Sequence, residues 1–336
     1  MSDAPASEYD RTLSIFFEGT ANRIRSWVTQ IAEYAEGTEA ADISDLRQPI
    51  PEGSQFKMLF DGCGAAYGFS GTVWGFGLEH QCKEVLTRVT ELLKLGTLRI
   101  NAVGLSRGGV AVILLAQMLP QDQPVSQLQL NALLFDPVPG NLVWFARWSL
   151  DTLAQRCKDI SSCQHLCNVL ALYPCDPLPD LAFHAPVLTT YPKTAHCKAR
   201  EEVLLGCHQG ALLSPQRDLS CQAACIRIQE WLLEVGSPYR PCSSQFQARG
   251  VLTPEAVLQK YDHALRQMVK GSSRSCHSLD GRAEIVKDPE GAEFVNHHHW
   301  HLAKKAGRDV PAEPGLCAIR IAGRSDPIPG NARDFL

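Results

Sequence analysis

The sequence predicts an α/β protein with a mostly parallel β-sheet that is flanked by helices on both faces. Short apolar runs typical of buried strands alternate along the chain with segments of helical apolar spacing. Gly, Ser and Asp residues follow these runs, at the strand ends where parallel sheets bind their ligands. The predicted strands are 13–17, 56–60, 100–103, 130–135 and 169–173.

Helical segments lie between and after these strands. The clearest is 78–95, whose apolar residues recur every three or four positions and which stops at Gly96. Segments 26–36 and 110–118 are also predicted as helices. A further helix is predicted to begin with Thr253 as N-cap and to end at Gly271.

The chain is expected to divide into three parts. Residues 1–11 form a flexible N-terminus, residues 12–250 the α/β domain, and residues 251–336 a C-terminal helix followed by an irregular cap or appendage. The last part is assigned on its polar composition beyond the helix, where Ser, His, Pro and Gly residues dominate.

Composition excludes several classes of protein. The 336 residues are 45% hydrophobic and 20% charged with a net charge of -4, which is ordinary for a globular protein and argues against general nucleic-acid binding. No apolar run is long enough to span a membrane, and the polar start of the chain is not a signal peptide. We therefore expect a protein made in the cytoplasm, with export only through a specialised secretion system that reads other signals.

The 13 cysteines contain no C-x-x-C pair. Cys157, Cys163, Cys167 and Cys175 fit no zinc-ribbon spacing, so we interpret them as small buried apolar residues of a reducing compartment.

The segment from Gly104 to Gly108 has the G-x-S-x-G pattern of a nucleophile elbow, with a strand before it and a helix after it. In this turn the serine has a strained backbone and an exposed hydroxyl, and side chains two residues away on either side would collide. The N-terminus of the following helix favours negative charge near the serine. Ser106 is therefore a candidate nucleophile.

A serine nucleophile needs a base, an acid that orients the base, and an oxyanion hole. His208 is the strongest candidate base, because it follows an apolar strand and has glycines on both sides, at 206 and 210. The alternatives are three other histidines. His165 lies in a Cys-rich segment that we interpret as helical, and His184 and His196 lie in polar loops.

Two aspartates are candidates for the acid. Asp136 ends the strand after the elbow unit, and Asp176 ends the next strand, which is the commoner place for the acid in this architecture. The oxyanion hole would use the backbone N–H of Arg107 and a donor from an early strand-end loop, Gly19 or Thr20.

Five segments, in order, resemble one family. This family is the α/β-hydrolase domain of uncharacterised function that includes the type VI secretion phospholipase effectors and fungal relatives. Its patterns FFDGTxN, YDGVGT, GFSRGA, WDTVG and GxHSDVGG are similar to the following segments of this sequence: FFEGTAN at 16–22, LFDGCG at 59–64, GLSRGG at 104–109, LFDPVPG at 134–140 and GCHQG at 206–210.

The resemblance covers roughly residues 12 to 215. It implies an α/β-hydrolase-like mostly parallel sheet flanked by helices, with the irregular C-terminal appendage outside the resemblance. It further implies a triad of Ser106, Asp136 and His208, no cofactor, and an acyl ester substrate such as a phospholipid. The sequence departs from the family at Glu18, where the family has Asp, and at Gln209 and Gly210, where it has Ser and Asp.

Two other features suggest contacts outside the triad. The aromatic, glycine-rich loop 64–77 carries Trp74 and Phe76, which could line an acyl pocket or make a peripheral membrane contact. His297 to His301 could hold a metal if three of its histidines shared one face, but we interpret it as a solvated loop or a polar partner surface, without metal.

Three functions remain open from the sequence. The first is a serine esterase or lipase-like effector, the second a binding module on a hydrolase fold without catalysis, and the third a metal-dependent protein that uses the histidine cluster.

Overall fold

The computed structural model describes residues 9–19, 32, 38–39, 51, 53–63, 77–139, 150–176, 185–208, 219–237, 253–267, 272–278, 281–287, 293–312 and 319–321. The structural statements that follow concern these residues.

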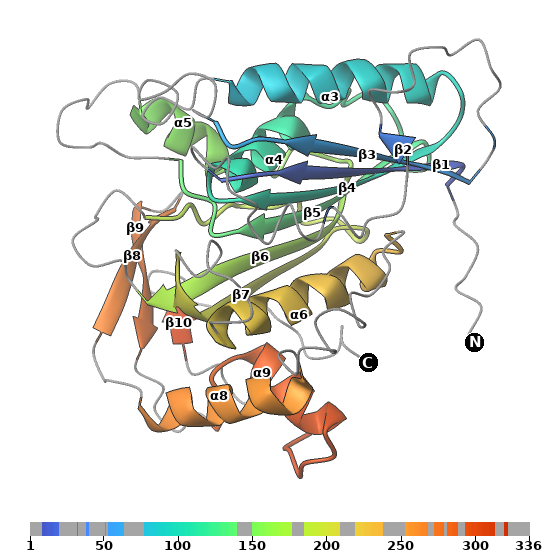
Figure 1. Ribbon diagram of the computed structural model, residues 1–336. Coiled ribbons are helices and arrows are strands. Elements are labelled where there is room, and N and C mark those ends of the chain that lie inside the picture. Colours follow the sequence, from blue (N-terminus) through green and yellow to red (C-terminus); the bar gives the residue numbers. More distant parts are fainter. Residues whose placement is uncertain are drawn as a thin grey trace.

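A seven-stranded sheet forms the centre of the molecule, with the strand order β2-β3-β1-β4-β5-β6-β7 (Figure 1). All neighbouring strands in it are parallel. This confirms the predicted α/β-hydrolase-like fold class, and each of the five predicted strands lies within an observed one. The strands are β1 (Arg11–Phe17), β2 (Thr38–Glu39), β3 (Ser54–Phe60), β4 (Leu98–Leu105), β5 (Leu128–Phe135), β6 (Leu166–Asp176) and β7 (Lys198–Cys207).

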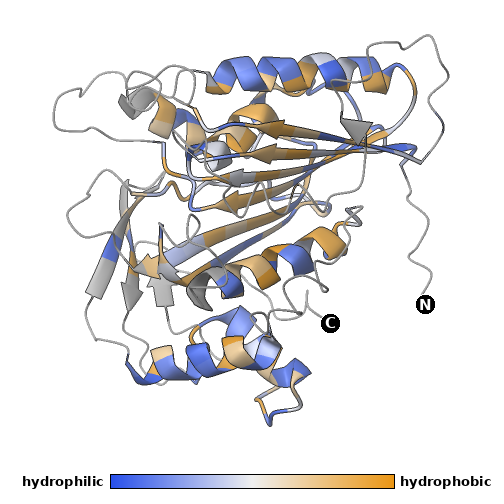
Figure 2. Cartoon of the chain, in the orientation of Figure 1, coloured by the Kyte–Doolittle hydropathy of each residue, from blue (hydrophilic) through white to orange (hydrophobic). Residues whose placement is uncertain are grey.

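Successive side chains of a strand point to opposite sides of the sheet. In the central strands the side chains on both sides are buried, because helices cover both faces. On one side, Ile100 and Ala102 of β4 join a core that includes α3 (Leu78–Leu93) and α4 (Arg107–Met118). On the other side, Val103 and Leu105 pack in a core with α6 (Leu219–Glu234). Figure 2 shows the apolar strands between these helices.

The helices agree with the sequence to within a few residues. The helix predicted over 78–95 is α3, and that predicted over 110–118 begins earlier, at Arg107. The C-terminal helix α8 (Pro254–Arg266) has Thr253 as N-cap, as predicted, but it ends before Gly271. The short helix α5 (Leu150–Cys157) and the longer helix α6 were not predicted. The predicted helix 26–36, apart from residue 32, and the loop 64–76 lie outside the described residues.

The C-terminal part is more regular than the sequence predicts. β8 (Ser272–Ser278), β9 (Gly281–Lys287) and β10 (Ile319–Ile321) form an antiparallel sheet, and α9 (His297–Lys305) lies beside α8 (Figure 1). Among the side chains of β8 that the structure describes, Arg274, Cys276 and Ser278 are buried. They stand at every second position and two of the three are polar, so hydrophobic periodicity could not reveal the strand.

Residues 9–11 are packed, although the sequence assigned them to a flexible terminus. The Tyr9 hydroxyl donates to the carbonyl of Val125 at 2.8 Å, and the Thr97 amide donates to the Asp10 carboxylate at 2.8 Å. The four cysteines Cys157, Cys163, Cys167 and Cys175 are buried and none of them forms a disulfide, as expected. Among the described residues, no helix is both long and apolar enough to cross a membrane.

Candidate functional site

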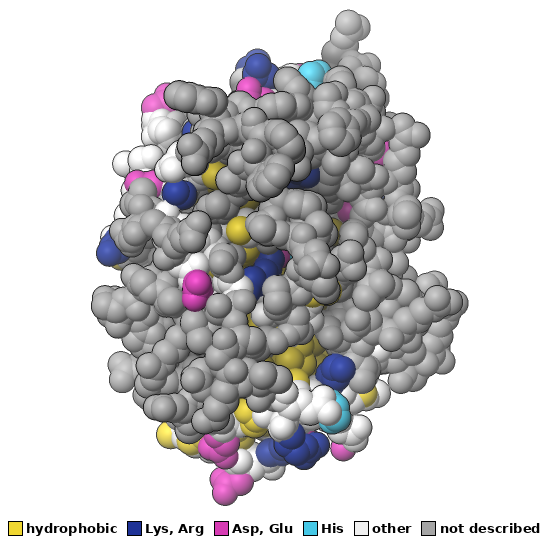
Figure 3. All heavy atoms as spheres, turned by 90° about the vertical axis from the view of Figure 1, so that its left-hand side faces the viewer, with side chains coloured by type: hydrophobic (Ala, Val, Ile, Leu, Met, Phe, Trp, Pro, Cys, Tyr) yellow, Lys and Arg dark blue, Asp and Glu magenta, His cyan; other side chains and the backbone are white. Residues whose placement is uncertain are grey.

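Three of the candidate residues follow the carboxyl ends of parallel strands. Ser106 follows β4, Asp136 follows β5 and His208 follows β7. β4 and β5 are in register up to Leu105 and Phe135, and the Ser106 amide donates to the Phe135 carbonyl at 2.8 Å. Ser106 and Asp136 therefore lie on adjacent strands at one edge of the sheet. Figure 3 views the molecule from this side and shows basic and hydrophobic side chains near its centre.

Ser106 has a strained backbone, with φ 56° and ψ -115°. A Cβ atom at Gly104 would lie 2.6 Å from the Gly109 amide nitrogen, and one at Gly108 would lie 2.8 Å from the Glu18 carbonyl oxygen. Both distances are shorter than real Cβ contacts, so the turn requires glycine at both positions. Gly104 and Gly108 of the G-x-S-x-G pattern are thus needed because neighbouring backbone atoms leave no room for a side chain at either position.

Strain of this kind occurs at a second candidate residue. Among the described non-glycine residues, Ser106 and Asp136 (φ 46°) are the two with positive φ. Each such residue costs on the order of 1–3 kcal/mol, and residues of this kind cluster at functional sites.

The hydroxyl of Ser106 is less open than the sequence suggests, because the residue is only 6% exposed. The turns that follow β1 and β5 pack around the elbow. A Cβ atom at Gly109 would lie 3.1 Å from the Cβ atom of Pro137, and Gly108 approaches the backbone of Phe17. Ser106 therefore lies in a largely covered position.

Asp136 and His208 are in direct contact. The Nδ1 atom of His208 lies 2.5 Å from the Oδ2 atom of Asp136, and both residues are buried. When Nδ1 donates to a carboxylate, a neutral imidazole carries its lone pair on Nε2, which is the arrangement a general base needs. Gly206, two residues before His208, has φ 91°, so the turn that presents the histidine requires a glycine there.

A third residue at this contact was missed by sequence reasoning. Arg274 of β8 donates from Nη1 to Oδ1 of Asp136 at 2.9 Å and from Nη2 to Oδ2 at 2.6 Å. Its Nη1 also donates to the Pro174 carbonyl at 2.7 Å. The segment that was read as an irregular appendage therefore reaches the carboxylate of Asp136, which is completely buried.

These contacts set the charge of Asp136. Burial would raise the pKa of the carboxyl, but the charge of Arg274 and then the hydrogen bond from His208 outweigh it, and the pKa lies below its ordinary value. Burial would lower the pKa of Arg274, and the charge of Asp136 more than reverses this effect. Both groups are therefore ionised at neutral pH.

The alternatives are placed differently. Asp176 ends β6 in register with Cys207, although its side chain is outside the described part of the chain. His165 lies before β6 and not in a helix, and it is buried with Nε2 2.5 Å from the Pro120 carbonyl. His196 lies in an exposed turn, and His184 is outside the described residues.

The expected oxyanion donors are partly described. Arg107 is the first residue of α4, so its amide lies at the N-terminal end of that helix, directly after Ser106. Gly19 lies beside the strand end, since a Cβ atom there would be 3.3 Å from Cγ of Leu105. Thr20 lies outside the described residues.

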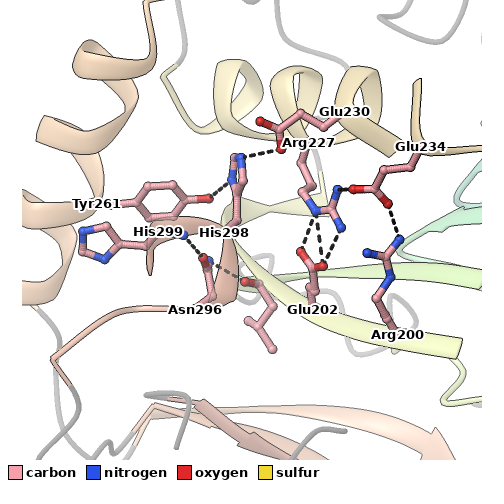
Figure 4. Close-up of polar contacts among 10 residues, drawn as sticks. Arg200, Glu202, Arg227, Glu230, Glu234, Tyr261, Asn296, His298 and His299 are labelled. Carbon is pink, nitrogen blue, oxygen red and sulfur yellow. Dashed lines mark hydrogen bonds and ion pairs between the residues drawn. The ribbon is translucent and has the colours of Figure 1, made fainter. Parts of the chain in front are cut away.

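The histidine cluster is buried, so its interpretation as a solvated loop or partner surface is wrong. His297, His298 and His299 are 6%, 2% and 1% exposed on α9. His298 Nδ1 is hydrogen-bonded to the Tyr261 hydroxyl at 2.8 Å (Figure 4). His299 Nε2 lies 3.0 Å from Asp262. Within the described ranges, no group of three or more His, Cys, Asp or Glu side chains is arranged to hold a metal ion.

These histidines border a buried ion network between α6 and β7 (Figure 4). Arg227 donates from Nη2 and Nε to Glu202 at 2.8 and 2.9 Å, and its Nη1 lies 3.3 Å from Glu234. Glu234 also accepts from Arg200 at 2.5 Å. Burial, followed by the charge of Arg227, lowers the pKa of His298 to about 3, so this ring is neutral and acts as a packing and hydrogen-bonding group.

Glu230 of this network is expected to make stability depend on pH. Burial raises its pKa to about 7, against the charges of Arg227 and Lys305. A carboxyl whose pKa is raised by folding stabilises the protein fully below its unfolded value of about 4.5, and this contribution is lost as the pH rises through about 7. Glu230→Gln should therefore be more stable than the natural protein at pH 8, by about 1–3 kcal/mol, and nearly equal at pH 5.

Chemical denaturation at the two pH values measures this difference. Glu293→Gln is the control, because Glu293 is exposed beside α9. Equal stability of Glu230→Gln and the natural protein at pH 8 would contradict the prediction.

Comparison with known proteins found similarity of fold but not of sequence. No protein-family model and no curated protein matches it. An uncharacterized protein from Pseudomonas aeruginosa is similar with a TM-score of 0.51 at 14% identity, over 77% of this chain and 51% of that one. The Tle1 effector bound to the VgrG spike of the type 6 secretion system is similar with a TM-score of 0.37 at 14% identity, over 62% and 51%.

A putative cell surface hydrolase from Lactobacillus plantarum is similar with a TM-score of 0.42 at 12% identity, over 68% of this chain and 93% of that one. This chain spans about half the length of the first two proteins. At these identities the likeness concerns the fold alone.

Proposed function

We propose that the protein is a serine hydrolase that cleaves an acyl ester. Ser106 is the nucleophile, His208 the general base and Asp136 the acid that orients the base. The observation that carries the proposal is the contact of His208 Nδ1 with Asp136, made at the strand edge where the strained Ser106 lies.

The steps follow from this arrangement. His208 takes the hydroxyl proton of Ser106 on Nε2 while the serine oxygen attacks the acyl carbonyl, and it then returns the proton to the leaving alcohol. Water attacks the acyl-enzyme by the same route and regenerates the serine. The Arg107 amide and the Gly19 segment are the proposed donors to the oxyanion, and such a donor typically contributes about 10²–10³ in rate.

The proposed substrate class is a lipid ester, and this part rests on the resemblance of the five sequence segments to phospholipase effectors. The covered position of Ser106 is compatible with an acyl chain that enters a shielded site. Export through a specialised secretion system belongs to the same proposal and depends on the same resemblance.

Covalent labelling by a fluorophosphonate tests the proposal. The natural protein should be labelled on Ser106, identified by mass spectrometry of the modified peptide. Ser106→Ala should take no label, and His208→Ala should react at least about 10²-fold more slowly, because the serine loses its general base.

His165→Ala is the matched control, since this histidine is also buried and hydrogen-bonded but lies elsewhere in the fold. It should be labelled at the natural rate. A folded natural protein that takes no label would contradict the proposal and favour a binding module on a hydrolase fold.

A further inference from the structure

Asp136 is held by two different parts of the chain. His208 contacts Oδ2 from the end of β7, and Arg274 contacts both carboxylate oxygens from β8, 138 residues along the chain from Asp136. Because the guanidinium binds in a bidentate manner, it fixes the plane of the carboxylate as well as its position. The orientation of Oδ2 toward His208 is thus set by Arg274.

The position of Arg274 is itself fixed by secondary structure. Its residue pairs with Ile285 in the antiparallel β8–β9 ladder, and its Nη1 is bound to the Pro174 carbonyl at the end of β6. Arg274 is 4% exposed, and Cys276 on the same face of β8 is also buried. The guanidinium is therefore supplied by a packed strand and not by a long side chain at the surface.

Arg274 supplies the largest compensating charge beside the carboxylate of Asp136. Asp136 is completely buried, and an unpaired carboxylate in such a place takes up a proton instead of remaining charged. The other titratable groups near Arg274 and Asp136 are the Cys175 and Cys276 thiols, with Glu201 acting on Cys276. Burial raises the pKa of Cys276 to about 12, so this thiol does not supply charge at neutral pH.

We propose that Arg274 is a positioning residue of the active site, which holds Asp136 in the orientation that His208 requires. This inference rests on the proposed function. It makes the C-terminal antiparallel sheet a structural part of the catalytic site, although the sequence analysis placed the boundary of the α/β domain at residue 250. In this role Arg274 does not itself touch substrate and acts through Asp136.

The test compares fluorophosphonate inactivation rates of purified full-length variants across pH. Arg274→Gln should react about 10- to 100-fold more slowly than the natural protein, because the carboxylate loses its fixed orientation. The low-pH limb of its rate profile should move upward by about one pH unit, since the buried carboxyl of Asp136 loses the charge that lowers its pKa.

Arg274→Lys separates charge from geometry. Lysine keeps the positive charge but not the bidentate contact, so the rate should fall while the low-pH limb stays in place. Arg308→Gln is the control, because Arg308 is an arginine of the same C-terminal part that pairs with Asp262 near the surface. This variant should match the natural protein in rate and profile.

A double substitution tests whether Arg274 acts through Asp136. In an Asp136→Asn background, Arg274→Gln should change the rate by less than about threefold, since the effects of two residues that act as one unit are not additive. An undiminished effect in that background would overturn the proposal, as would a natural rate and profile for Arg274→Gln alone.

The outcomes separate the two proposals. If the natural protein is labelled on Ser106 and the Arg274 variants behave like it, only the positioning role fails. If the folded natural protein takes no label, the hydrolase proposal fails and the role of Arg274 fails with it. If Arg274→Gln loses its cooperative thermal unfolding, the rate and profile of Arg274→Lys decide, and a natural rate there would count against the role.

Discussion

Asp136→Asn is expected to lower kcat for ester hydrolysis about 10⁴-fold. The amide keeps the shape of the carboxylate, but it cannot stabilise the imidazolium that forms when His208 takes the serine proton. It also favours the wrong imidazole tautomer, the mechanism by which the equivalent change in a serine protease lowers kcat by about this factor. Steady-state hydrolysis of an activated ester by natural and variant protein measures the effect.

Asp176→Asn is the matched control, because Asp176 ends the neighbouring strand and was the second candidate for the acid. This variant should keep natural activity. The reverse result, with activity lost on changing Asp176 and kept on changing Asp136, would show that the acid was assigned to the wrong strand. Thermal unfolding of both variants is needed, because Asp136→Asn also removes the partner of a buried arginine.

Arg227→Met is expected to destabilise the fold by about 3–5 kcal/mol. Arg227 and Glu202 have side chains that are 1% and 2% exposed, and the change would leave the Glu202 carboxylate buried without its bidentate partner. Breaking a buried pair on one side costs this much because an uncompensated charge remains in the interior. Urea denaturation at pH 7 measures the free energy of unfolding.

The double variant Arg227→Met with Glu202→Leu should recover most of the loss, since it removes both charges together. Arg156→Met provides an exposed comparison, because its ion pair with Glu79 has side chains that are 48% and 56% exposed. That variant should change stability by less than about 1 kcal/mol. A similarly small effect for Arg227→Met would refute the idea that the network stabilises the junction of α6 and β7.

The parallel sheet could be predicted because its strands are nearly continuous apolar runs. β4 and β5 are buried along most of their length, so each gives a strong signal without any partner strand being known. The residues after these strands could be predicted as a site for the same reason: once the strands are placed, Ser106 and Asp136 must come to one edge. The glycines at 104, 108 and 206 marked the turns.

The contribution of the C-terminal part could not be predicted in the same way. Arg274 stands in a serine-rich segment (SSRSCHS) whose buried face is largely polar, and hydrophobic patterning treats such a segment as a loop. Its partner is far away in sequence, and no local rule connects an arginine with an aspartate across such a distance. The signal that existed was the alternation of Arg274, Cys276 and Ser278.

The histidine run was misread for a related physical reason. A polar sequence such as NHHHWH predicts exposure because burying an imidazole requires a partner. Here the partners come from other helices: Tyr261 and Asp262 of α8 contact His298 and His299. Whether such partners exist is decided by tertiary packing, which periodicity within one segment does not report.

The distance in sequence between Asp136 and Arg274 also bears on how the protein is synthesised. Arg274 follows Asp136 by 138 residues, a distance that takes roughly 7–28 s to synthesise at ordinary translation rates of about 5–20 residues per second. During that interval the nascent chain contains Asp136 but not yet the guanidinium that pairs with it in the complete fold. On the proposed function, the carboxylate of Asp136 would be held in its final orientation only after β8 has been synthesised and packed.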